Sequence, residues 1–116
     1  MNDVFAQLEE WGCDVAGTKA RFLNDESLYI TCLNGVLEDK SFEKLGEAIS
    51  EQDCKKAFDA THNIKGFLAN MGLTPMYNIA IEIMEPLRKG TVTGHEKNYK
   101  ALMESKKKLA QIMGKI

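Results

Sequence analysis

The stretch of residues 59–72 restricts the fold of this chain most strongly, because its apolar residues recur with the period of an α-helix. With about 100° of rotation per residue, these apolar side chains fall in an arc of roughly 140° to 240° from His62. A stripe of this width is typical of a helix that packs one side against a core. The pattern therefore predicts an amphipathic helix, ending at Gly72, with His62 on its solvent-exposed side. The stripe consists of Ala57, Ala60, Ile64, Phe67, Leu68 and Met71.

The exposed side of this predicted helix carries His62, with Lys65 and Gly66 three and four residues further on. A glycine inside a helix costs roughly 0.5–1 kcal/mol relative to alanine. Helical side chains lean toward the N-terminus, so any side chain at position 66 would cover the imidazole. The arrangement is that of an accessible nucleophile with a nearby cation, although an isolated surface histidine beside a solvated lysine fits these residues equally well. The other side chains around His62 are Lys55, Phe58, Asp59 and Ala69.

The segment Thr61-His62-Asn63-Ile64-Lys65-Gly66, followed by Asn70 and Gly72, resembles the signature of histidine-containing phosphotransfer (HPt) domains. That signature has a small residue, histidine, any residue, a hydrophobic residue, lysine and glycine, then asparagine and glycine. The segments 12–15, 20–22 and 25–29 are similar to the amino-terminal part of free-standing bacterial members, so the resemblance covers most of the chain. The chain departs from the family at Thr61, where alanine is usual, and at the bulky Phe67 and Leu68.

The resemblance implies a histidine phosphotransfer protein of a two-component phosphorelay, without kinase activity of its own. His62 would exchange a phosphoryl group, at its Nε2 atom, with the aspartate of a response-regulator receiver domain. A hybrid or sensor histidine kinase would be a further partner. Lys65 would stabilise the added charge, since Cβ atoms three residues apart on a helix are about 5–6 Å apart. Gly66 would keep His62 accessible, and the surface around it, with Lys55, Phe58, Asp59 and Ala69, would bind the receiver.

Other segments of the chain also show helical patterns. We expect short helices ending near Gly12 and Leu23, a long helical segment over 25–51 that is either one bent helix or two, and a helix capped by Thr74. Gly90 to Gly94 reads as a loop before a final helix that reaches Ile116, and His95 reads as an exposed loop residue without a role. Asp14, Asp25 and Asp53 are positioned as helix caps. Short connections favour an all-α, antiparallel up-and-down four-helix bundle, with the two N-terminal helices capping one end.

Length and composition are those of one soluble domain over residues 1–116. The net charge of −2 gives no reason to expect nucleic acid as a partner. Three cysteines match no zinc spacing and favour reduced, buried thiols in a cytoplasmic protein. The N-terminus lacks the basic start of a signal peptide, and no apolar run is long enough to span a membrane. We expect a cytoplasmic monomer.

The sequence lacks a glycine-rich nucleotide loop and kinase motifs, and Asp59 is the one carboxylate close to His62 on the predicted helix. We therefore expect no cofactor of its own, and a magnesium ion held by the partner receiver domain. Two alternatives stay open. The protein could bind and sequester a receiver without transfer, which a bulky Thr61 beside the ring would permit. A metal- or cofactor-binding bundle ranks lower, because such a site needs several inward-facing ligands.

Overall fold

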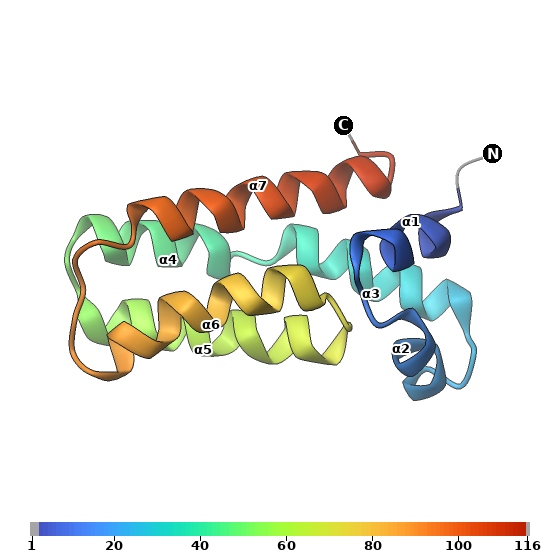
Figure 1. The fold of residues 1–116 in the computed structure, drawn as a ribbon, viewed down its shortest axis with the longest axis horizontal. Helices are drawn as coiled ribbons and strands as arrows, with labels where there is room; N and C mark the ends of the chain where they lie inside the picture. Colours follow the sequence, from blue (N-terminus) through green and yellow to red (C-terminus); the bar gives the residue numbers. More distant parts are fainter. Residues whose placement is uncertain (1–2, 116) are drawn as a thin grey trace.

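The computed structural model describes residues 3–115, and within that range it contains seven α-helices and no β-strand (Figure 1). The prediction of an all-helical chain is confirmed for these residues. The predicted contribution of Ile116 to the last helix lies outside the described residues. The helices are α1 (Val4–Trp11), α2 (Val15–Arg21), α3 (Glu26–Glu38), α4 (Ser41–Ser50), α5 (Cys54–Asn70), α6 (Thr74–Arg88) and α7 (Glu96–Ile112).

Aspartate side chains begin four of the helices, because a carboxylate can accept hydrogen bonds from the free amides of the first turn. The predicted caps Asp14, Asp25 and Asp53 are confirmed, with carboxylate-to-amide distances of 3.0 to 3.1 Å. Asp3 caps α1 in the same way. Thr74, in contrast, is the first residue of α6 rather than its cap; Leu73 occupies that position and makes no side-chain cap bond.

The segment over residues 25–51 is two helices rather than one bent helix. Asp39 adopts an extended conformation, with φ −69° and ψ 132°, and so ends α3. Its Oδ1 atom accepts a 2.8 Å hydrogen bond from the amide of Ser41, the first residue of α4. The side chain of Asp39 thus stabilises the start of the next helix while its backbone interrupts the previous one.

Helix α5 makes its most extensive contacts with α4 and α6, and α6 also packs along α7 (Figure 1). The short helices α1 and α2 lie at one end of the molecule, beside α3. The core side of α5 matches the predicted stripe, since five of its six residues are buried and Phe67 is half-buried against the core. The buried five are Ala57, Ala60, Ile64, Leu68 and Met71.

The prediction that His95 is an exposed loop histidine is wrong. His95 is 2% exposed, and its Nε2 atom lies 2.9 Å from the carbonyl oxygen of Thr91. It is the residue immediately before α7, so its ring folds back over the loop that joins α6 to α7. The predicted loop over Gly90 to Gly94 is confirmed.

Candidate functional site

His62 lies on the exposed side of α5, opposite the buried stripe. Gly66, one turn further along, is also exposed, and a Cβ atom built there would have no neighbouring atom within 4 Å. Lys65 is half-buried at the edge of the same surface. The structure therefore brings an uncovered imidazole and a lysine to one side of α5, as the sequence predicted for these positions.

Two of the predicted partner-binding residues, Lys55 and Asp59, form an ion pair of 3.1 Å on the first turns of α5. Their side chains are 86% and 66% exposed, so the pair contributes little to stability and can exchange partners when a charged surface approaches. Ala69 is exposed two turns beyond His62. Lys55, Asp59, His62 and Ala69 occupy one helix side because their spacings of four, three and seven residues are close to whole turns of an α-helix.

Phe58 is half-buried and packs against the core, so it is less exposed than its helical position suggested. Its ring lies almost parallel to the imidazole of His62, with 6.1 Å between ring centroids and 19° between planes. The guanidinium of Arg88, the last residue of α6, lies 5.5 Å from the centre of the Phe58 ring. The sequence around Arg88 does not predict this contact, because its local pattern does not show which helix the side chain meets.

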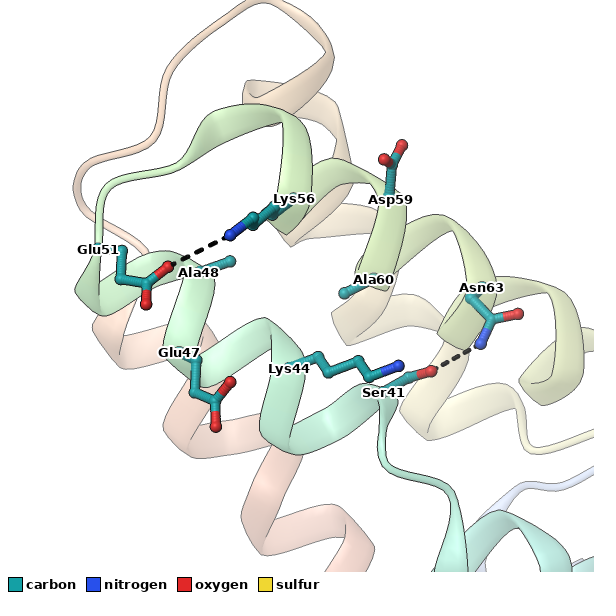
Figure 2. A pocket seen from close by; sticks show the side chains of 9 residues that line it. All are labelled: Ser41, Lys44, Glu47, Ala48, Glu51, Lys56, Asp59, Ala60 and Asn63. Atoms are coloured by element: carbon teal, nitrogen blue, oxygen red, sulfur yellow. Dashed lines mark hydrogen bonds and ion pairs between the residues drawn. The ribbon is translucent and has the colours of Figure 1, made fainter.

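A groove of about 430 Å³ runs between α4 and α5 (Figure 2). It adjoins the candidate site because Asp59 and Asn63 flank His62 along α5. Asn63 donates a 2.6 Å hydrogen bond to the hydroxyl of Ser41, and Lys44 extends from α4 along the groove. The contribution of α4 to this surface could not be predicted from the sequence of α5. The groove is lined by Ser41, Lys44, Glu47, Ala48, Glu51, Lys56, Asp59, Ala60 and Asn63.

Thr61 does not lie beside the imidazole on the exposed surface, so that part of the prediction is wrong. Its side chain is fully buried, and its hydroxyl donates a 2.7 Å hydrogen bond to the carbonyl of Ala57 on the previous turn. Pairing with the backbone satisfies the hydroxyl inside the core. The bulk that distinguishes Thr61 from alanine is therefore directed away from the approach to His62.

The described residues, 3–115, contain no group of three or more histidine, cysteine or acidic side chains placed to hold a metal ion. Within the same range, no helix has the length and apolar character needed to cross a membrane. The chemistry visible at the surface of α5 is thus that of one imidazole, one nearby lysine and a rim of mixed charge.

Comparison with known protein families gives a match to the Hpt domain over residues 38–112. The matched segment contains α4, α5, α6 and α7 in full, and with them His62, Lys65 and Gly66. The comparisons with curated proteins and with solved structures give no match. Since the matched segment spans well over half of the chain and includes the helix that presents the exposed histidine, this protein belongs to the HPt domain family.

Proposed function

We propose that His62 accepts a phosphoryl group from the phosphoaspartate of a response-regulator receiver domain and passes it on to another. HPt domains act in phosphotransfer within two-component signalling and interact with receivers and kinases. One observation carries the assignment to this side chain: His62 is exposed on a helix inside the matched domain, and Gly66, one turn further on, has no side chain that could cover its ring. His95, in contrast, is almost completely buried.

In the proposed reaction, the lone pair of Nε2 of the neutral imidazole attacks the phosphorus atom of the acyl phosphate. The N–P bond forms as the bond between phosphorus and the bridging carboxyl oxygen of the aspartate breaks, and the aspartate leaves as a carboxylate. The imidazole keeps its Nδ1 proton during the step and can release it to water afterwards. Because the transition state is loose, positioning and charge stabilisation supply most of the catalysis. Lys65 would stabilise the phosphoryl oxygens through a charge-assisted interaction.

The receiver would cover the exposed side of α5, contacting Lys55, Phe58, Asp59 and Ala69, and would supply the magnesium ion and its acidic pocket. The groove beside α4 would widen that contact, since its charged side chains continue from Asp59. An exposed Ala69 and a half-buried Phe58, rimmed by charged side chains, have the pattern of a small transient interface.

We also infer that the chain forms an antiparallel up-and-down four-helix bundle, capped at one end by α1 and α2. In this bundle α3 and α4 together are the first member, followed by α5, α6 and α7. We further infer that the protein works as a cytoplasmic monomer. The packing of consecutive helices supports this arrangement. Sedimentation equilibrium tests the monomer, and metal analysis of the purified protein tests the proposal that it carries no metal of its own.

The decisive experiment incubates the protein with a radiolabelled phosphorylated receiver and magnesium. We expect an acid-labile, base-stable label on the parent that is absent from His62→Gln. A second, unphosphorylated receiver should then remove the label. Labelling of His62→Gln at the parent level would show that another side chain is the acceptor. Tight receiver binding without any label on the parent would favour the alternative, a module that sequesters a receiver.

A further inference from the structure

We propose that Arg88 is a positioning residue that orients the imidazole of His62 through the ring of Phe58. The inference rests on the proposed function, in which His62 is the reacting group. It adds a residue of α6 to a site that otherwise belongs to α5 and α4. Arg88 does not need to touch the phosphoryl group for this role.

The first link is the contact between the two rings on α5. Phe58 precedes His62 by four residues, so both side chains leave the same side of the helix. The planes are 19° apart and the centroids 6.1 Å apart, which is within the range of offset-stacked rings. Because Phe58 is half-buried against the core, its ring is held by neighbours, whereas His62 is exposed. The Phe58 ring therefore restricts the rotation of the His62 ring.

The second link is the contact between Arg88 and the same ring. Its guanidinium carbon lies 5.5 Å from the centre of Phe58, the geometry of a cation–π interaction. The Nε atom of Arg88 also lies 3.8 Å from a carboxylate oxygen of Glu85, one turn earlier on α6. A planar guanidinium suits stacking on an aromatic ring better than an ammonium group does. Arg88 thus contacts the Phe58 ring from the neighbouring helix and restricts its movement.

The consequence concerns the direction in which the ring nitrogen points. In-line attack on phosphorus requires the lone pair of the imidazole to be aimed at the partner's acyl phosphate. An exposed histidine without neighbours samples several orientations of its ring, of which only some are productive. Holding a reacting group in the productive geometry lowers the barrier without new chemistry. Phe58 and Arg88 would supply that restriction before the receiver arrives.

The first test needs no phosphoryl transfer. The ring current of Phe58 should displace the His62 ring-proton resonances in the NMR spectrum of the unphosphorylated protein. We expect Phe58→Leu to move them toward random-coil positions and Arg88→Gln to move them part of the way. Phe58→Tyr should retain most of the displacement. Arg88→Lys should fall between Arg88→Gln and the parent, because an ammonium group keeps the charge but stacks less well on the ring. Lys89→Gln, the same change of charge one residue further on, is the matched control. Unaltered His62 resonances in Arg88→Gln would overturn the inference.

The second test is a double-mutant cycle on the rate of phosphoryl acceptance. Arg88→Gln should slow acceptance by about two- to fivefold, the size of one cation–π contact at an exposed site. In a Phe58→Tyr background the same slowing should persist, and in Phe58→Leu it should disappear. Equal slowing in both backgrounds would mean that Arg88 contacts the receiver directly and would refute the positioning role. Failure of the parent to label at His62 would instead refute the proposed function, whatever the NMR result.

Discussion

The amide of Asp14 donates a 2.9 Å hydrogen bond to the carbonyl of Gly72, which joins the start of α2 to the end of α5. Hydrogen bonds within α2 and between α2 and α5 strengthen this junction. The hydroxyl of Thr18 donates to the carbonyl of Asp14 at 2.7 Å, and Arg21 donates to the carbonyl of Asn70 at 2.9 and 3.1 Å. Helix α2 thus satisfies backbone groups at the end of the helix that carries His62.

The junction predicts that Gly72→Ala destabilises the fold. Gly72 has a φ of +65°, and a Cβ atom there would collide with the hydroxyl of Thr18 and lie 2.6 Å from the carbonyl oxygen of Asp14. We expect a loss of about 2–4 kcal/mol in the free energy of unfolding, from backbone strain and overpacking together. Urea denaturation measures it. Gly90→Ala is the matched control, since Gly90 has a φ of +89° but open space around it, and should lose only about 1 kcal/mol.

Gly66→Arg should block phosphoryl transfer while leaving the helix as stable as in the parent, or slightly more stable. The arginine side chain would lean over His62, whereas nothing in the fold opposes a side chain at this position. Receiver-dependent labelling and thermal melting are the two measurements. Gly35→Arg is the control, because Gly35 is also inside a helix with nothing within 4 Å, but on α3. Transfer at the parent rate in Gly66→Arg would refute the role assigned to this glycine.

Lys65→Ala should accept phosphate at a reduced rate without loss of fold. The lysine is one turn from His62, and a charge-assisted hydrogen bond contributes about 1.5–3 kcal/mol where it is fully formed. For a half-buried lysine we expect the lower part of that range, a slowing of about tenfold. Single-turnover kinetics with one phosphorylated receiver measure it, and Lys107→Ala on α7 serves as the control for loss of one positive charge. Unchanged kinetics would remove Lys65 from the site.

Cys13 should be the least reactive of the three thiols toward alkylation. Burial raises its pKa to about 11, against the opposing influence of Lys108. At pH 8, a thiol with a pKa of about 11 has about a hundredfold less thiolate than one with a pKa of 9.0, and the thiolate is the reacting form. Cys32 and Cys54 are only half-buried. Timed iodoacetamide labelling with mass spectrometry should show Cys13 protected in buffer and reactive in urea; labelling of Cys13 as fast as the other two in buffer would contradict the prediction.

The amino-acid sequence by itself determined the helical fold class and which side of α5 faces the core. The period of its apolar residues places Ile64 and Leu68 in the core and His62 outside, since this follows from helix geometry alone. Helix caps such as Asp53 could also be predicted from the sequence, because a cap accepts hydrogen bonds from amides only two or three residues away. Gly66 could be interpreted in the same way, since its effect on His62 lies within one turn.

Tertiary structure decided every feature that depends on contacts between helices. The burial of His95 and the groove between α4 and α5 depend on how segments distant in the sequence pack together. The ring of Phe58 shows the difference most clearly. Its helical position places it near His62, but contact with the core half-buries it, and the packing of α6 against α5 brings Arg88 to its ring. Side-chain periodicity defines which side of a helix a residue occupies, whereas the neighbour on that side is selected by the packing of the whole chain.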